Sequence, residues 1–271
     1  MIDVGSALRG YVRWLPTNQY LLVKDLRNKL RIHRHPRLTY DKSAQLFVCH
    51  DGETAIHFCH MVRAGRYVGG IRKRAELLAA EYLLDLVDFV PGDVMVDCGA
   101  NVGELGIWAN ERELCYVPVE PEDREADCID LNVFGGETRT IRKALWMNNT
   151  KLTFYSAPET ADSSLIDPGK YDSVREVEAI TVAELMASEV IDTVKLLKID
   201  AEGAEPEVLL GCASVIDRIE YIVVECGFER GPKQASPIWD VYNFCMTNGL
   251  EFVNIRGVRL ASLFRNPGFR K

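Results

Sequence analysis

The stretch at 94–106, V-M-V-D-C-G-A-N-V-G-E-L-G, most constrains what this chain can fold into. Its first three residues are apolar and predict a short buried strand that Asp97 ends with a carboxylate. Gly99 and Gly103 let the backbone turn tightly, and residues 102–110 have the length and character of a helix. A strand, a glycine turn and a helix N-terminus together form a nucleotide-binding corner, because the turn leaves backbone N–H groups facing a ligand.

The glycine spacing and Asp97 narrow the choice of ligand. Gly99, Gly103 and Gly106 give G-x-x-x-G-x-x-G rather than the G-x-G-x-x-G of dinucleotide-binding proteins. A carboxylate before the first glycine would repel a pyrophosphate, but it would attract the amino group and sulfonium of S-adenosylmethionine (SAM). We therefore expect SAM as the cofactor, bound by a set of residues in this corner: Asp97, Gly99, Ala100, Asn101 and Gly103.

A second acidic residue follows the next predicted strand. Residues 115–119 are mostly apolar, and Glu120 and Pro121 come directly after them. Glu120 lies 21 residues after Gly99, where an acidic side chain at a strand end can hydrogen-bond a ribose diol. NAD and SAM both carry that diol, so Glu120 alone does not separate them. We expect Glu120 and Pro121 to line the cofactor site.

Three motifs together resemble the FkbM-type SAM-dependent methyltransferases. They are V-D-C-G-A-N-V-G at 96–103, V-E-P at 119–121 and L-K-I-D-A-E-G-A-E at 197–205, and the resemblance covers roughly residues 71–227. It implies an O-methyltransferase of a sugar, a polyketide or another natural product. It also implies the α/β fold of class I methyltransferases, a Rossmann-like, seven-stranded, mostly parallel sheet with helices on both faces.

The predicted elements divide the chain into two parts. We expect an N-terminal α+β extension over residues 1–70 and a SAM-binding methyltransferase domain over residues 71–271. In the extension, residues 46–60 predict a β-hairpin, because two stretches rich in β-forming residues flank the turn-forming pair Asp51-Gly52.

A third strand of the larger domain is predicted over residues 139–143, and it leads to the expected adenine site. In the architecture that the resemblance implies, the segment after this strand lies against the adenine. Ala144 and Leu145 are therefore the expected contacts, with Trp146 either as an apolar wall of the site or as a core residue.

A second set of candidate residues follows two later strands. Residues 194–199 predict a buried strand that Asp200 and Glu202 follow, and Glu225 comes after the strand predicted over 221–224. In open α/β sheets ligands bind at the carboxyl ends of the strands, so these carboxylates are expected to converge with those of the corner. We expect Asp200 to contact the cofactor as well. Glu202 could instead be a helix N-terminal charge that favours the helix dipole.

These carboxylates indicate how a methyl group would be transferred. A carboxylate that takes the proton of a sugar hydroxyl as the new C–O bond forms contributes about 10²–10⁴ in rate. We expect Asp200 or Glu202 in this role, with Glu225 as the next candidate. A divalent metal shared by the same carboxylates is the rival arrangement, although the sequence does not indicate one.

Composition and charge limit the location and the partners. We find no run of about 18 apolar residues and no secretory signal, so we expect a cytoplasmic protein without a membrane span. The first 74 residues carry 14 Lys or Arg and 5 Asp or Glu, whereas the remainder carries 18 and 35. This basic segment either meets an anionic glycan or a membrane surface, or packs against the acidic body. We expect no nucleic-acid partner, and the oligomeric state stays open.

Three other functions stay open. A polyketide or other natural product could replace the sugar acceptor, for which a bacterial surface polysaccharide or glycolipid is the first choice. A nicotinamide-dependent oxidoreductase would use the same kind of sheet, but the glycine spacing disfavours it. A protein that binds SAM or a glycan without catalysis would keep the motif at 94–106, but it would not need acids after the strand at 194–199.

Overall fold

The computed structural model describes residues 36–157 and 163–270. The chain divides into two compact units, residues 1–74 and residues 75–271. Much of the basic N-terminal segment lies outside the described residues. The domain boundary expected after residue 70 stays a prediction.

The described part of the first unit is a small antiparallel sheet with the strand order β1-β2-β3. Its elements are β1 (Arg37–Asp41), β2 (Leu46–Asp51), β3 (Thr54–Phe58), the 3-10 helix η1 (Met61–Tyr67) and the first turn of α3 (Ile71–Glu81). The predicted hairpin is confirmed, because Asp51 pairs with Thr54 across a two-residue turn. The Asp51 carboxylate also accepts the Ile71 N–H at 3.0 Å, so the same residue caps the start of α3.

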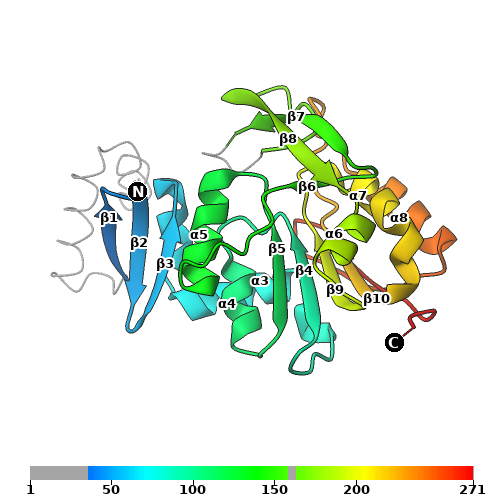
Figure 1. Cartoon of the computed structure of the whole chain (residues 1–271), viewed down its shortest axis with the longest axis horizontal. Helices are drawn as coiled ribbons and strands as arrows, with labels where there is room; N and C mark the ends of the chain where they lie inside the picture. Colours follow the sequence, from blue (N-terminus) through cyan, green and yellow to red (C-terminus); the bar gives the residue numbers. More distant parts are fainter. Residues whose placement is uncertain (1–35, 158–162, 271) are drawn as a thin grey trace, which may run out of the picture. The chain divides into compact units, whose positions relative to one another are not determined.

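The second unit is an α/β domain with helices on both faces of its main sheet (Figure 1). After α3 its elements are η2 (Leu84–Leu86), β4 (Val94–Cys98), α4 (Glu104–Asn110), β5 (Cys115–Val119), α5 (Asp123–Phe134), β6 (Ala144–Leu145), β7 (Thr150–Ser156), β8 (Ser173–Ile180), α6 (Val182–Ser188), β9 (Val194–Ile199), α7 (Glu205–Cys212), η3 (Ala213–Arg218), β10 (Ile219–Val224), α8 (Ile238–Thr247), β11 (Glu251–Arg256) and β12 (Ala261–Arg265). Within the described ranges, no helix combines the length and the apolar character that crossing a bilayer requires.

The main sheet has six strands in the part of the chain that the structure describes, in the order β11-β12-β10-β9-β4-β5. Strands β5, β4, β9 and β10 are parallel, whereas β12 runs antiparallel to both β10 and β11. The predicted α/β sheet with helices on both faces is therefore observed. The prediction of seven strands is wrong for the described residues.

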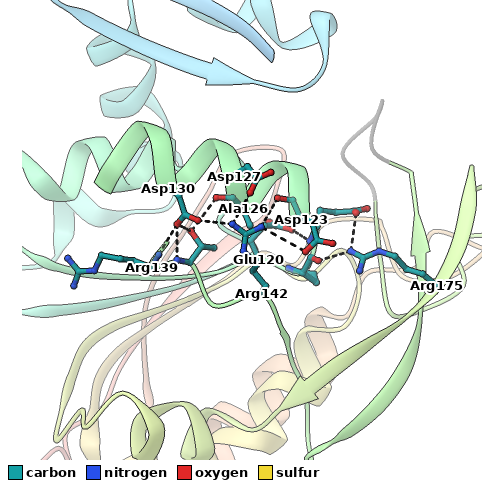
Figure 2. Close-up of polar contacts among 11 residues, drawn as sticks. Glu120, Asp123, Ala126, Asp127, Asp130, Arg139, Arg142 and Arg175 are labelled. Atoms are coloured by element: carbon teal, nitrogen blue, oxygen red, sulfur yellow. Dashed lines mark hydrogen bonds and ion pairs between the residues drawn. The ribbon is translucent and has the colours of Figure 1, made fainter. Parts of the chain in front are cut away.

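The missing strand is the one predicted over residues 139–143. Only Ile141 joins β5 there, through an isolated parallel bridge. The N–H groups of Arg139 and Thr140 instead donate to Asp130 Oδ1, at 3.1 and 2.9 Å (Figure 2). Because a carboxylate on α5 takes these two donors, they are not available to extend the strand pairing.

Three strands form a separate small sheet. Its order is β6-β8-β7, with β7 antiparallel to β8 and β6 parallel to it. Residues 144–145, expected beside the cofactor, form β6, so the segment after the third predicted strand belongs to this sheet rather than to the main one.

Alternate residues of the parallel strands pack on opposite faces of the main sheet. Val96 belongs to the core under α6, α7 and α8, whereas Met95 and Leu196 belong to the core under α3 and α4. Asp97 and Lys198 lie two residues beyond Met95 and Leu196, so both lie on the α3–α4 face of the sheet.

Candidate functional site

The carboxyl ends of four neighbouring parallel strands bring the expected acidic residues to one edge of the main sheet. These residues are Asp97 near the end of β4, Glu120 after β5, Asp200 after β9 and Glu225 after β10. Strand β9 lies next to β4 although β5 follows β4 in the chain. The topological switch point is therefore between Asp97 and Asp200, where open α/β sheets bind their ligands.

The turn after β4 is held in close contact with the end of β9. Gly99 has a φ of +73°, and a Cβ at this position would lie 1.9 Å from the carbonyl oxygen of Asp200. Only glycine fits such an approach of two backbones. Asn101 also has a positive φ, of +54°, and Gly103, at +79°, directly precedes α4. The helix therefore begins at Glu104 rather than at the predicted residue 102.

Gly99→Ala is expected to lower the free energy of unfolding of the second unit by about 2–3 kcal/mol, because it combines an unfavourable φ with a backbone clash. The matched control is Gly135→Ala. Gly135 has a φ of +64°, but a Cβ there meets no atom within 4 Å, so a loss of only about 1 kcal/mol is expected. Urea denaturation of both variants measures the difference. Equal losses would contradict the close approach.

Asp97 is paired inside the protein. It is 1% exposed, its Oδ1 lies 2.9 Å from Lys198 Nζ, and its Oδ2 accepts the Tyr116 hydroxyl at 2.6 Å. Sequence reasoning expected this carboxylate to attract a cationic ligand directly. The structure shows that Lys198, its partner in the β4–β9 register, already supplies a cation. Direct contact between Asp97 and a cofactor stays a prediction.

Glu120 is buried at the end of β5 (Figure 2). Its Oε2 accepts the Asn101 N–H at 2.8 Å, and its Oε1 accepts the Glu122 N–H at 2.9 Å. Burial raises the pKa of Glu120 to about 8, although these two hydrogen bonds favour the ionised form. Glu120 thus joins the glycine turn to the end of the neighbouring strand.

This pKa predicts a pH dependence of stability. A carboxyl group whose folded pKa is about 8, against an ordinary value of 4.5, stabilises the folded state below pH 4.5, and this contribution is lost as the pH rises to about 8. The free energy of unfolding should therefore fall across this window, and Glu120→Gln should show a smaller fall. Urea denaturation near both ends of the window measures the two slopes. Equal slopes would show that Glu120 titrates normally.

Glu122 joins the end of β5 to the small sheet. Its Oε1 accepts hydrogen bonds from the hydroxyl groups of Ser156, at 2.5 Å, and Ser163, at 2.9 Å. Arg175 Nη2 lies 3.1 Å from Glu122 Oε2 and donates to the Pro121 carbonyl at 2.6 Å (Figure 2). Pro121 thus provides a carbonyl acceptor for a side chain of β8, which fixes the backbone beside Glu120.

Asp200 and Glu225 form the most connected part of the site. The hydroxyl of Tyr82, a residue only 2% exposed, donates to Asp200 Oδ2 and to Glu225 Oε2, the latter at 3.2 Å. Arg259 Nη1 lies 2.8 and 3.0 Å from the two Glu225 oxygens. Lys198 Nζ and Arg259 Nη1 lie 3.7 and 3.8 Å from Asp200 Oδ2. Asp200 Oδ1 is buried and accepts no hydrogen bond from the described residues.

The environments of these two carboxyl groups separate their pKa values. Burial, together with the charge of Asp200, raises the pKa of Glu225 to about 10. Burial alone would also raise the pKa of Asp200, but Lys198, Glu225, Arg259 and Tyr82 together lower it. At neutral pH the pair therefore holds one proton on Glu225 and a negative charge on Asp200.

The turn after Asp200 has an unusual backbone. Glu202 has a φ of +50° and Gly203 a φ of +97°, and the Glu202 carbonyl accepts the Ser164 hydroxyl at 2.7 Å. Glu205 Oε1 accepts the N–H groups of Ala201 and Gly203 at 2.9 and 3.0 Å. Burial raises the pKa of Glu205 to about 7. Glu205 thus fixes the turn that carries Glu202, whose role as a base stays a prediction.

Ala144 and Leu145, the expected adenine contacts, are both buried in β6. Trp146 is 8% exposed and packs with Ala144 and Phe154 in the core beside the small sheet. Trp146 is therefore a core residue, the second of its two expected roles. The contacts of Ala144 and Leu145 with adenine stay a prediction.

Among the described residues, Asp200, Glu225 and Glu229 offer carboxylate oxygens that all lie within 4.8 Å of one another. A divalent cation prefers such oxygens. However, the guanidinium of Arg259 already lies against Asp200 and Glu225 and compensates the negative charge of this pair. The arrangement of these residues therefore does not favour a metal site more than an internal ion pair.

A cavity of about 430 Å³ lies elsewhere in the second unit, with Glu76, Leu84, Phe89, Trp108 and Arg112 among its lining residues. Trp108 is in the second half of α4, which begins beside the end of β4 and returns along the sheet. Phe89 precedes the start of β4. The cavity therefore lies towards the opposite ends of the strands and is not part of the candidate site.

Three residues of the site were missed by sequence reasoning: Lys198, Tyr82 and Arg259. Lys198 did carry a signal, since a lysine inside an apolar strand is buried only with a partner. Apolar residues at helical spacing over 71–89 predict one helix with Tyr82 on its apolar stripe. In the structure α3 ends at Glu81, and Leu83 has a φ of +62°. No sequence pattern marks Arg259.

A family model described as the methyltransferase FkbM domain matches residues 97–258, which is more than half of the chain. The match spans Asp97, Glu120, Asp200 and Glu225, and it excludes Tyr82. No curated protein sequence shows significant similarity to this chain.

A comparison with solved structures finds several matches of limited similarity. Magnesium protoporphyrin IX methyltransferase from Synechocystis PCC 6803, with bound SAM, has 11% identity over 79% of this chain and 84% of its own, with a TM-score of 0.41. A TehB-like SAM-dependent methyltransferase from Corynebacterium glutamicum has 11% identity over 72% and 95%, with a TM-score of 0.39. A SAM-dependent methyltransferase from Aquifex aeolicus has 10% identity over 72% and 96%, with a TM-score of 0.38.

Proposed function

Because this chain belongs to the FkbM methyltransferase family, we propose that it is a SAM-dependent O-methyltransferase whose acceptor is a sugar hydroxyl. A bacterial surface polysaccharide or glycolipid is the acceptor that we favour. The observation that carries the proposal is the convergence of Glu120 and Asp200 on the two sides of the Gly99 turn, at the topological switch point. A cytoplasmic location is part of the same proposal.

Two buried oxygen atoms at this edge of the sheet can accept hydrogen bonds from SAM. Asn101 Oδ1 and Asp200 Oδ1 are buried acceptors without a donor among the described residues. The cofactor carries the matching donors, an α-ammonium group and a ribose diol. We assign the diol to Glu120 and place Gly99, Ala100, Gly103 and Pro121 along the cofactor, with Ala144 and Leu145 beside the adenine.

Bound SAM supplies an electrophilic methyl group on its sulfonium. The protein has to hold the acceptor hydroxyl in line with that group and take up its proton. Glu225 is the least suited of the three candidate bases, because it holds a proton at neutral pH, whereas Asp200 is ionised. We therefore place Asp200 and Glu202 before Glu225.

Different experiments separate the other candidate functions. A non-catalytic SAM-binding protein would keep the same cofactor residues, so only a turnover assay separates it from an enzyme. A polyketide acceptor would use the same base and cofactor residues, so only an acceptor screen separates it from a sugar. Two roles for the basic N-terminal segment, binding an anionic acceptor and contacting a membrane surface, remain proposals that the same screen can test.

Calorimetric titration with S-adenosylhomocysteine and, in parallel, with NAD tests the proposal. We expect a dissociation constant of about micromolar for S-adenosylhomocysteine and no binding of NAD. Repeating the titration after a chelator should leave the affinity unchanged; a loss would favour the metal arrangement. Binding of NAD alone would sink the proposal.

A screen of bacterial monosaccharides and their nucleotide-diphosphate forms, read out as S-adenosylhomocysteine release, then tests the acceptor class. Release with at least one sugar and not with phenolic polyketides is the expected result. The opposite pattern would replace the sugar by a polyketide and leave the cofactor assignment intact.

A further inference from the structure

Tyr82 lies outside the segment that matches the family model, yet its hydroxyl reaches both acidic residues at the ends of β9 and β10. Its ring is buried, and Lys198 Nζ lies 5.1 Å from the ring centroid. Burial, with Asp200 and Glu225 nearby, raises the pKa of Tyr82 well above its ordinary value, so the hydroxyl keeps its proton and remains a donor.

The two oxygens of Asp200 have unequal surroundings. Oδ2 accepts the Tyr82 hydroxyl and faces the cations of Lys198 and Arg259. Oδ1 is buried without a donor from the described residues. A buried acceptor without a donor costs free energy, so a ligand that brings a donor to Oδ1 regains it. The hydrogen bond from Tyr82 fixes which oxygen is left for that ligand.

We infer that Tyr82 is a positioning residue of the cofactor site, which holds Asp200 by Oδ2 and so presents Oδ1 to the α-ammonium group of SAM. The inference rests on the proposed function. A cationic donor is the best match for Oδ1, because charge-assisted hydrogen bonds to a carboxylate are stronger than neutral ones. Glu225 is a second acceptor for the Tyr82 hydroxyl, and Arg259 in turn donates to Glu225.

Tyr82→Phe tests this role, because it removes one oxygen and keeps the ring against Lys198. Two ligands are titrated by calorimetry: S-adenosylhomocysteine, which has the α-ammonium group, and 5′-methylthioadenosine, which lacks it. The variant should bind S-adenosylhomocysteine about tenfold more weakly than the unmodified protein. Its affinity for 5′-methylthioadenosine should stay within about twofold, which also shows that the variant is folded.

Tyr242→Phe is the matched control. Its hydroxyl donates to Ser262 Oγ at 3.3 Å and contacts no carboxylate of the residues that the structure describes, so both affinities should stay unchanged. A second readout is the pH dependence of S-adenosylhomocysteine binding. The groups that face Asp200 are Tyr82, Lys198, Glu205, Glu225, Glu229 and Arg259. Loss of the Tyr82 donor raises the pKa of Asp200, so Asp200 takes up its proton at a higher pH in the variant. As the pH is lowered, binding to the variant should therefore weaken earlier, at a higher pH than binding to the unmodified protein.

Three results would overturn the inference. Equal weakening of both ligands in Tyr82→Phe would mean that Tyr82 only supports the fold. Unchanged binding of both, with an unchanged pH profile, would mean that Asp200 does not need it. Failure of the unmodified protein to bind S-adenosylhomocysteine would remove the proposed function together with the inference, which distinguishes that failure from the first two.

Discussion

Lys198→Met is expected to lower the free energy of unfolding of the second unit by about 3–5 kcal/mol, the usual cost of removing one partner of a buried ion pair. Lys198 and Asp97 are 2% and 1% exposed, with 2.9 Å between Nζ and Oδ1. The ammonium also donates to the carbonyl groups of Cys98 and Gly99, at 3.0 and 2.8 Å. Methionine keeps the length of the side chain but leaves one carboxylate and two carbonyl oxygens without this donor.

The cation is retained in the folded protein across the neutral range. Burial alone would lower the pKa of Lys198, but Asp97 and Asp200 raise it above its ordinary value. The large effect of Lys198→Met should therefore be present at any pH at which the protein is usually studied.

Lys195→Met provides the control on the same strand. Lys195 pairs with Glu220 at 3.0 Å, but both side chains reach solvent, and a loss of about 1 kcal/mol or less is expected. Chemical denaturation of both variants gives the comparison. Similar losses for the two lysines would mean that Lys198 does not compensate a buried charge.

Asp200→Asn is expected to slow methyl transfer about 10²–10⁴-fold, because the neutral amide neither accepts the proton of the acceptor hydroxyl nor attracts the α-ammonium group of SAM. The measurement is S-adenosylhomocysteine release with a sugar that the acceptor screen identifies. Glu225→Gln is the matched comparison. Glu225 already holds a proton at neutral pH, so its neutral amide should slow transfer less than tenfold.

The pattern across three variants identifies the base. A large loss in Glu202→Gln, with a small one in Asp200→Asn, would exchange the roles of these two residues. Undiminished transfer in Asp200→Asn, with S-adenosylhomocysteine still bound, would exclude Asp200 as the base. If no sugar or polyketide supports transfer in the unmodified protein while S-adenosylhomocysteine binds, the non-catalytic alternative gains support.

The fold class followed from local patterns. Apolar runs that end at Asp97 and Asp200 predicted the strands β4 and β9, and glycine positions predicted the turn after β4. These features are local, because burial of a strand and a tight turn depend on residues next to each other in the chain. The prediction of a third strand is wrong because the outcome there depends on a contact with another part of the chain. Asp130 accepts hydrogen bonds from the N–H groups of Arg139 and Thr140, and no residue pattern near position 139 predicts that contact.

The sequence by itself determined which acidic residues lie at strand ends, and hence that Asp97, Glu120, Asp200 and Glu225 share one edge of the sheet. Only the tertiary structure decided their charges. Lys198 reaches Asp97 across neighbouring strands, while Tyr82 and Arg259 arrive at Asp200 and Glu225 from opposite ends of the domain sequence. The protonation of a buried carboxyl group depends on charges within a few ångströms in space, and residues distant in the sequence supply them.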